Sequence, residues 1–347
     1  MAKKLKENRG SVKLLRIGLL WILLAVLLVV LSVTAVNIGS VKYSVGEIVS
    51  SVFAEESALT PEQNVIKTIV MNLRLPRVVL EILVGACLSA AGALLQAVMR
   101  NPLADPGSIG VSAGAGTAAI TVLLIFPNMT TALPMFAFVG AALACVLIYV
   151  MAWKDGVSPV RIILAGVAIN SVLGAYNSLL QLMNSDNLTG VLAFMNGSLS
   201  GMSWTHVGTI LSYSIIGLLL ALLCIRHANA LQLGDEMAKN LGIRVNGARI
   251  ALSAVSAFLA AATVSVVGMI SFVGLVVPHI SRMLVGSDYK VMLPTSILLG
   301  SVTLLVADTI GRTLIPGLEI PVGIVMSVCG GPFFLYILRK RGKYNEG

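Results

Sequence analysis

Charged residues are scarce in this chain of 347 residues. Asp, Glu, Lys and Arg together make up 11% of the sequence, against about a quarter in soluble globular domains. Hydrophobic residues make up 57%, and the mean hydropathy is +0.95. This composition excludes a soluble fold and indicates an integral membrane protein, because so few charged residues could not cover the surface of a soluble domain with this many hydrophobic residues.

Cysteine, histidine and aromatic residues are also few. The four cysteines lie far apart in separate apolar runs, so they form neither a metal-ligand spacing nor a plausible extracellular bridge. The net charge is +9, but only 5% of the residues are aromatic and no soluble domain of 50 residues is present. We therefore expect no metal site and no nucleic-acid partner, and attribute the basic residues to membrane topology and to attraction by lipid headgroups.

Motifs for catalysis are missing or lack their context. The phosphate-binding pattern Gly-x-x-x-x-Gly-Lys-Ser/Thr occurs nowhere, so we expect no ATP hydrolysis and no cofactor bound by this chain. Residues 110–114 read GVSAG, which matches the Gly-x-Ser-x-Gly nucleophile motif of hydrolases. That motif requires a preceding strand and an underlying sheet, and the flanking residues are helix-like apolar runs. The sequence therefore predicts a non-catalytic protein, with an intramembrane hydrolase as a remote alternative.

Apolar runs long enough to cross a bilayer follow one another along the chain. About 17 to 25 apolar residues span a hydrocarbon core of roughly 30 Å. We predict a single all-α membrane domain over residues 1–347 with ten transmembrane helices. The predicted spans are 15–36, 78–98, 110–126, 134–152, 162–183, 206–225, 250–271, 273–286, 292–311 and 320–338.

The loops between these runs differ in basic charge. With both termini in the cytoplasm, the inner side holds 19 Lys or Arg and the outer side five, as the positive-inside rule requires. The longest outer loop is then about 37–74, and the longest inner loop is about 226–249. Within the inner loop, Gly234 precedes the sequence DEMAKNLG, which predicts one or two short helices ended by Gly242.

Polar and small residues recur on one face of two predicted spans. In the fifth span the stripe comprises Asn170, Gly174, Asn177, Ser178 and Gln181. In the second span it comprises Gly85, Ser89, Gly92 and Gln96. Small residues allow helices to approach closely, which is the simpler interpretation of the second span. Two asparagines and a glutamine exceed what packing needs, so we interpret the fifth span, with Gln96, as lining a transport pathway.

Few ionisable residues fall within the spans. Glu81, Asp308 and Arg312 are the candidates, and Asp308 and Arg312 are four residues apart on one helix face. We expect Asp308 and Arg312 to form a structural ion pair. An ion-coupled secondary transporter would need more carboxylates at mid-membrane, so it is the weaker hypothesis.

The segment after the second span reads RNPLADPGSIGVSAGAG from Arg100 to Gly116. Two prolines stop the preceding helix, Asp105 or Ser108 can cap the next one, and the glycines permit a tight return of the chain. We interpret this segment as a turn at the inner membrane face that can act as a gate.

Six motifs follow one another along residues 74–339. They are RLPR (74–77), QAVMRNPLADPGSIGVSAGAG (96–116), RIILAGVA (161–168), LGDEMAKNLGI (233–243), GMISFVGLVVPHISR (268–282) and LEIPVG (318–323). In this order they resemble the FecCD-type permeases of ABC importers for ferric siderophores, haem and cobalamin. The resemblance implies the type II importer fold in a bacterial cytoplasmic membrane. It also implies a second permease, identical or not, two cytoplasmic ATPases that bind ATP and Mg²⁺, and an outer substrate-binding protein.

The resemblance implies roles for particular residues. Docking of the binding protein falls to Arg74, Arg77 and Arg312. The cytoplasmic gate falls to Asn101, Leu103 and Ser158. Coupling to the ATPase falls to Gly234, Asp235, Glu236, Ala238, Leu241 and Gly242. The cargo expected from it is an iron complex, with a ferric siderophore favoured and haem or cobalamin as alternatives.

Overall fold

The computed structural model describes residues 2–39, 43–53, 60–154, 156–185 and 188–345. In this part of the chain the architecture is all-helical, with two isolated β-bridges and no named strand. Ten apolar helices match the ten predicted spans in order, which confirms the fold class. They are α1 (Ala2–Asn37), α4 (Leu75–Met99), α5 (Val111–Ile125), α6 (Leu133–Ala152), α7 (Pro159–Met183), α9 (Trp204–Leu223), α12 (Val245–Val267), α13 (Val273–Val285), α14 (Tyr289–Thr313) and α15 (Val322–Asn345).

Length divides these helices into two groups. By length and composition, seven helical segments of the described residues are long and apolar enough to cross a membrane. The apolar parts of α5, α13 and α15 are shorter, at 10 to 17 residues. Short spans of this kind bring irregular backbone to membrane depth, where it must be covered by neighbouring helices.

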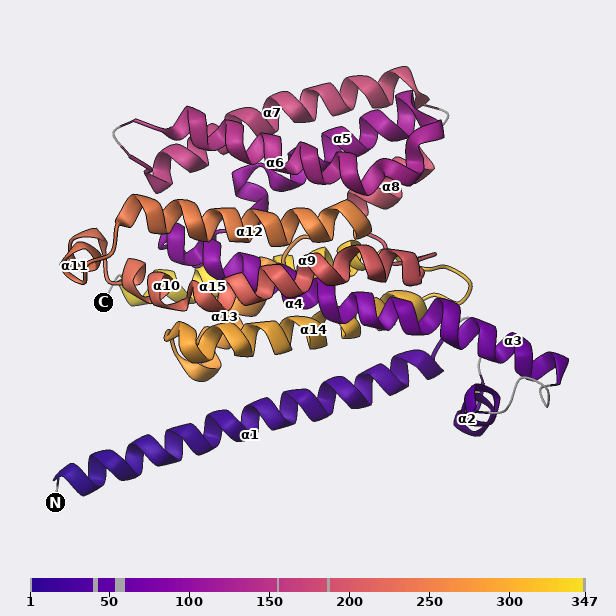
Figure 1. The fold of residues 1–347 in the computed structure, drawn as a ribbon, viewed down its shortest axis with the longest axis horizontal. Coiled ribbons are helices and arrows are strands. Elements are labelled where there is room, and N and C mark those ends of the chain that lie inside the picture. Colours follow the sequence, from indigo (N-terminus) through magenta and orange to yellow (C-terminus); the bar gives the residue numbers. More distant parts are fainter. Residues whose placement is uncertain (1, 40–42, 54–59, 155, 186–187, 346–347) are drawn as a thin grey trace.

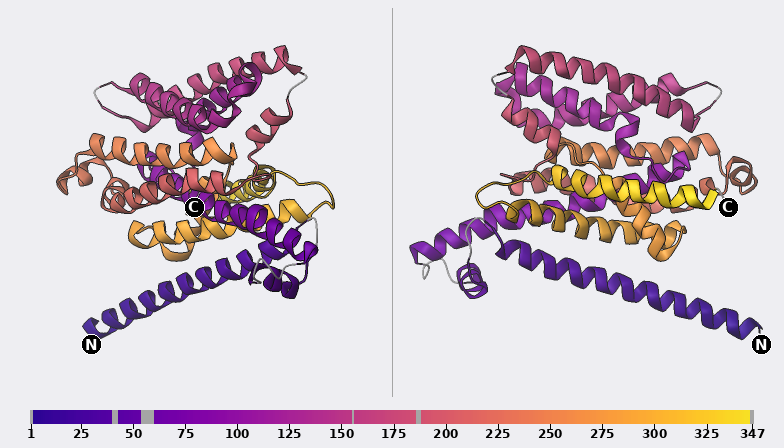
Figure 2. Two further views of the ribbon diagram at one scale, coloured as in Figure 1. Left: turned by 45° about the vertical axis from the view of Figure 1, so that its right-hand side comes forward. Right: turned by 180° about the vertical axis from the view of Figure 1, so that it is seen from behind.

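The helices form layers around α4. Figures 1 and 2 show α5, α6 and α7 together on one side of the molecule and α1 on the opposite side, with α4, α12, α13 and α14 between them. Residues of α4 contact α9, α12, α13 and α14, and 83% of its most apolar stretch is buried. In α1 and α7 only 11% of the most apolar stretch is buried.

Glycines set the spacing of the central helices. A Cβ atom added to Gly92 would lie 1.8 Å from the carbonyl oxygen of Gly274 in α13. One added to Gly85 would lie 2.3 Å from the carbonyl oxygen of Gly300 in α14. Backbones this close leave no room for any side chain, so the packing interpretation of Gly85, Ser89 and Gly92 is confirmed.

Short helices occupy both ends of the bundle. At the end where α4 begins are α2 (Val45–Phe53), α3 (Pro61–Ile69) and the π-helical turn η2 (Val70–Arg74), and α8 (Thr189–Asn196) follows α7. At the end where α4 stops are the 3₁₀ turn η3 (Pro106–Ile109), α10 (Ile225–Gln232) and α11 (Asp235–Asn240), which confirms short helices within 226–249. A further 3₁₀ turn, η4 (Pro127–Ala132), joins α5 to α6.

The predicted outer loop 37–74 extends too far along the chain, into residues that are helical. Helix runs without interruption from Pro61 through α3 and η2 to Met99. Thr60 begins it with a capping box, because its hydroxyl accepts from the amide of Gln63 while the Gln63 side chain accepts from the amide of Thr60. Residues 40–42 and 54–59 of that loop lie outside the described part.

Candidate transport site

Opposite charges cluster where α4 begins and α14 ends. Arg77 is 8% exposed, and its Nε and Nη2 atoms donate to the two carboxylate oxygens of Asp308 at 2.9 and 3.0 Å. Its Nη1 atom donates to Glu319 in the loop between α14 and α15 at 2.8 Å. One guanidinium therefore fixes three chain segments through charge-assisted bonds.

A second arginine shares the same acids. Arg312 Nε lies 3.0 Å from Asp308 Oδ2, which confirms the predicted ion pair on α14. Its Nη2 atom lies 3.7 Å from Glu81 Oε1, and Arg77 Nε lies 3.8 Å from the same oxygen. The side chain of Glu81 is fully buried, so both guanidiniums compensate a carboxylate that water does not reach.

Arg74 is engaged with the end of α1. Its Nη1 atom donates to the carbonyl oxygens of Val36 and Asn37 at 2.8 and 3.1 Å, and its guanidinium carbon lies 5.4 Å from the ring centre of Tyr43. The residue is 6% exposed. Arg74 thus ties the C-terminal end of α1 to the start of α4.

Arg74, Arg77 and Arg312, the residues expected to dock the binding protein, are engaged within this chain and are not free surface charges. Their side chains are taken up by carboxylates and carbonyls of this same chain, and the side chain of Arg312 is only 5% exposed. Glu319 is the most accessible acid of the cluster, at 39%. Burial acts to raise the pKa of Glu319, but the hydrogen bond and charge of Arg77 outweigh it and hold that pKa below its usual range.

The polar stripe of α7 lies at the edge of the molecule. Gly174 and Ser178 are exposed, and a Cβ atom added to Gly174 would meet nothing within 4 Å. Asn170, Asn177 and Gln181 are half-buried. Asn170 Nδ2 donates to the carbonyl oxygen of Gly107, but the Oδ1 atoms of Asn170 and Asn177 accept no hydrogen bond from the described residues. Both oxygens are themselves buried, so the unused acceptors of the stripe are covered by this chain.

Gln96 does not belong to that stripe. It is 2% exposed, its Nε2 atom donates to the carbonyl oxygens of Gly274 and Leu275, and its Oε1 atom accepts from Arg282 at 3.1 Å. The prediction that Gln96 lines the pathway is contradicted, because the residue satisfies the backbone at the start of α13. Proximity along the sequence to other polar residues could not distinguish these two roles.

The predicted gate segment is a capped turn. Arg100 ends α4 with a left-handed backbone, φ 47°, and Asn101 Oδ1 then accepts from the amide of Leu103 at 3.0 Å. Asp105 caps η3 by accepting from the amide of Gly107 at 2.8 Å. Burial raises the pKa of Asp105, and the hydrogen bond from Gly107 opposes that rise only in part. Side-chain hydrogen bonds thus hold the turn in one conformation.

Ser158 begins α7 but makes no capping bond with its side chain. The residue before it is held instead: the Val157 amide donates to Asn246 Oδ1 at 3.3 Å, and its carbonyl accepts from Arg249 Nη1 at 2.8 Å. The start of α7 is therefore fastened to the start of α12.

The predicted coupling residues in and around the short helix α11 differ in their exposure. Glu236, Leu241 and Gly242 are exposed, Gly234 and Asp235 are half-buried, and Ala238 is fully buried. Ala238 therefore cannot meet a partner directly. Met237 and Leu241, 52% and 53% exposed, instead form an apolar pair on the outward face of the helix.

One guanidinium joins α11 to the start of α7. The Nη2 atom of Arg249 donates to both oxygens of Asp235 at 2.9 and 3.1 Å, while its Nη1 atom holds Val157. Arg100, at the end of α4, places Nη2 3.9 Å from Asp235 Oδ1. Asp235 thus lies between the two segments that were predicted to form the gate.

A sequence profile described as the FecCD transport family matches residues 25–340. The chain belongs to the FecCD transport family. The Fe(3+)-citrate import system permease protein YfmE of Bacillus subtilis (strain 168) is 39% identical over 319 residues, covering 92% of this chain and 94% of that protein. The iron(3+)-hydroxamate import system permease protein FhuG of the same organism is 37% identical over 323 residues, covering 90% and 94%.

A solved structure supports the same assignment. It is described as an inward-facing metal-chelate type ABC transporter, and it matches with a TM-score of 0.81 at 28% identity over 92% of this chain and 98% of that one. This FecCD permease is therefore a multi-pass membrane subunit of an ABC importer for an iron chelate, haem or cobalamin.

Sequence reasoning missed Arg249, Arg100 and Glu319. The sequence patterns place Arg249 and Arg100 only among the basic residues of inner loops, and Glu319 only within the LEIPVG motif. The contact between Arg77 and Glu81 was detectable from the sequence, because the two residues are four apart on the same helix. No sequence spacing connects Asp235 with Val157 or Arg77 with Glu319, because those contacts depend on helix packing.

Proposed function

We propose that this permease imports a ferric siderophore across a bacterial cytoplasmic membrane, with both termini in the cytoplasm. The observation that carries the proposal is the similarity, over nine-tenths of the chain, to permeases named for ferric citrate and ferric hydroxamate. The stripe of α7 fits a bulky preformed chelate, since it offers neutral polar side chains, among them the exposed Ser178, without a cluster of metal ligands among the described residues.

The pathway is proposed to form between this chain and a second permease, along α7. Asn170, Gly174, Asn177, Ser178 and Gln181 are its wall on this side. Only 11% of the apolar stretch of α7 is buried, so a second subunit or lipid must cover the remainder. Asn101, Leu103 and Ser158, at the ends of α4 and α7, are the proposed inner gate.

Two cytoplasmic ATPases are proposed to supply the energy by binding ATP and Mg²⁺ and contacting α11. Met237 and Leu241 would fill an apolar depression on the ATPase, while Gly234, Gly242 and the buried Ala238 keep the short helix in place. A movement of α11 would be transmitted through Asp235 and Arg249 to Val157, because the charge-assisted bonds from Arg249 Nη2 to both oxygens of Asp235 resist separation better than a neutral contact.

An outer substrate-binding protein is proposed to dock around the ends of α4 and α14. Arg74, Arg77 and Arg312 would shape that surface by holding α1, α4, α14 and the loop containing Glu319 in one arrangement. Their contribution to docking is then indirect, and the partner would meet the rim of the cluster.

The function is tested by uptake into cells that lack this gene or carry it restored. Labelled ferric siderophores, haem and cobalamin are supplied separately, with and without ATP depletion. The proposal predicts ATP-dependent uptake of a ferric siderophore only in the restored cells. ATP-dependent uptake of haem or cobalamin alone would overturn the siderophore assignment, and uptake that survives ATP depletion but collapses with an uncoupler would indicate a secondary transporter.

The coupling route is tested separately with Arg249→Met. We expect the ATPase to remain bound and to hydrolyse ATP, while uptake falls, and Arg249→Lys to restore part of it. Arg226→Met is the matched control, since Arg226 is exposed on α10 and forms no ion pair with a described residue. Full uptake by Arg249→Met would contradict this route.

A further inference from the structure

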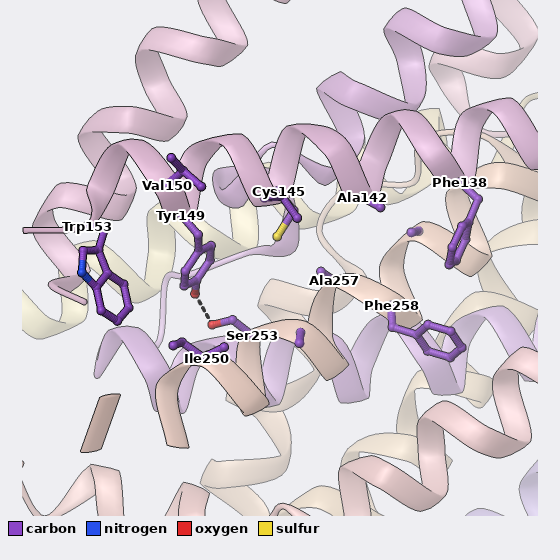
Figure 3. Close-up of a pocket in the computed structure, with 13 residues that line it drawn as sticks. Phe138, Ala142, Cys145, Tyr149, Val150, Trp153, Ile250, Ser253, Ala257 and Phe258 are labelled. Carbon is purple, nitrogen blue, oxygen red and sulfur yellow. Dashed lines mark hydrogen bonds between the residues drawn. The ribbon is translucent and has the colours of Figure 1, made fainter. Parts of the chain in front are cut away.

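An apolar groove runs between α6 and α12 on the surface of the bundle (Figure 3). Its volume is about 630 Å³, within the roughly 300–1,000 Å³ typical of ligand sites. Its floor consists of small, buried residues, among them Cys145, Ser253 and Ala257. Val146 and Val150 form the rim and are 60% and 65% exposed.

The groove contains almost no unused polar group. The hydroxyl of Tyr149 donates to Ser253 Oγ across the groove, so each satisfies the other (Figure 3). At the outer end Phe138 and Phe258 pack edge to face at 5.9 Å. Both α6 and α12 are long and apolar enough to span a bilayer, so the groove lies at membrane depth and a suitable occupant is a hydrocarbon chain.

The inner end of the groove differs from the rest. Trp153 closes it, is 53% exposed, and its indole N–H donates to no residue that the structure describes. Lys154 follows directly, and Arg244 precedes α12; both are exposed, and neither forms an ion pair within the described residues. The two segments that meet here, residues 153–161 and 235–250, contain five Lys or Arg and three Asp or Glu.

We propose that this groove binds one anionic phospholipid of the inner leaflet, with an acyl chain between α6 and α12 and the phosphate near Trp153, Lys154 and Arg244. Phe138 and Trp153 are 15 residues apart, or about 22 Å along a helix, which exceeds half of a roughly 30 Å core. An acyl chain therefore fits lengthwise. Basic and aromatic residues at one end only match a molecule with an anionic head and an apolar tail better than they match a second protein helix.

The site is separate from the proposed pathway, because none of the groove residues belongs to α7. A bound lipid would fill the surface where α6 and α12 diverge and would stabilise their contact. The proposal goes beyond transport of the cargo, and only the choice of leaflet depends on the orientation proposed above.

Trp153 supplies the probe. The chain has three tryptophans, so Trp21→Phe with Trp204→Phe leaves Trp153 as the sole indole. The full chain in that background is reconstituted in vesicles of phosphatidylcholine with increasing fractions of phosphatidylglycerol that carries brominated acyl chains, which quench indole fluorescence on contact. Brominated phosphatidylcholine serves as the reference lipid.

We expect saturable quenching of Trp153 at a phosphatidylglycerol fraction about tenfold lower than for phosphatidylcholine, since each nearby basic residue favours an anionic headgroup. Lys154→Gln with Arg244→Gln should remove most of that preference. Ala142→Phe with Ala254→Phe fills the groove from exposed positions and should abolish saturation. Ala251→Phe is the matched control, because Ala251 is exposed on α12 but does not line the groove.

Identical quenching curves for the two lipids, or for the filled and control variants, would overturn the proposal. So would covalent dimers formed across Val150→Cys in the membrane, since a second copy of the chain would then occupy the groove. Melting temperature and a single size-exclusion peak establish that each variant is folded.

Discussion

Helices α4 and α7 each contain 25 residues and carry a stripe of small and polar residues, yet the fold uses them differently. In α4, 83% of the most apolar stretch is buried, and its glycines touch neighbouring backbones. In α7 the corresponding figure is 11%, and Gly174 faces open space. A small-residue stripe therefore indicates a contact surface without showing whether the contact lies inside the chain or outside it.

The largest effect that separates the two helices is expected from glycine substitutions. Gly92→Ala should destabilise the protein by about 3 kcal/mol or more, because the added methyl group would lie 1.8 Å from the Gly274 carbonyl oxygen and force the backbones apart. Gly174→Ala should be neutral or stabilise by up to about 1 kcal/mol through helix propensity. Thermal melting and the yield of monodisperse protein in detergent measure the stability of both variants. Equal melting temperatures would show that α4 and α7 do not differ in how tightly their glycines are packed.

The next effect concerns the charges at the two ends of α4. Arg77→Ala should cost about 3–5 kcal/mol, because it removes both hydrogen bonds of Arg77 to the buried Asp308 and leaves two buried carboxylates, Asp308 and Glu81, to Arg312 alone. Arg100→Ala should cost at most about 1 kcal/mol, since that side chain is 44% exposed and 3.9 Å from its partner. Arg77→Met combined with Asp308→Asn should recover part of the loss. No difference between the single variants would show that the outer cluster is solvated.

A smaller effect should appear in transport alone. Asn177→Ala should not lower the melting temperature, because it removes a buried oxygen that has no hydrogen-bond partner among the described residues. It should reduce siderophore uptake about fivefold, equivalent to one lost hydrogen bond of about 1 kcal/mol, because the rest of this half-buried amide lies on the proposed wall of the pathway. Val172→Ala is the control, as Val172 is 70% exposed on the same helix and outside the stripe. Unaltered uptake by Asn177→Ala would remove the stripe from the pathway.

The smallest effect is expected from pH. The folded-state pKa of Glu319 lies below its unfolded value, so its contribution to stability is complete above the unfolded pKa and is lost as the pH falls through the folded pKa. The melting temperature of the unmodified protein should exceed that of Glu319→Gln at pH 7, and the gap should close between about pH 5 and pH 3. A gap that stays constant over this range would refute a role for ionised Glu319.

Much of the fold could be predicted because a bilayer limits the choices. Within it the backbone must bond to itself, so ten apolar runs had to be helices, and prolines 102 and 106 had to end α4 and begin η3. The boundary at Pro61 could not be seen, because α3 is polar on one face and resembles a loop in composition. The pairing of Asp308 with Arg312 was predictable from spacing, whereas the pairing of Asp308 with Arg77 was not.

By itself, the sequence determined that this chain crosses a membrane many times, that it lacks a nucleotide-binding loop, and that its motifs are those of a FecCD permease. These are properties of composition and of residues near one another along the chain. Only the tertiary structure decided that Arg74, Arg77 and Arg312 are engaged within the chain, that Gln96 bonds to the backbone of α13, and that Arg249 joins α11 to the start of α7. The contacts of Arg249 with Asp235 and of Arg77 with Glu319 join residues 14 and 242 positions apart, and their geometry is set by how closely glycines allow the helices to pack.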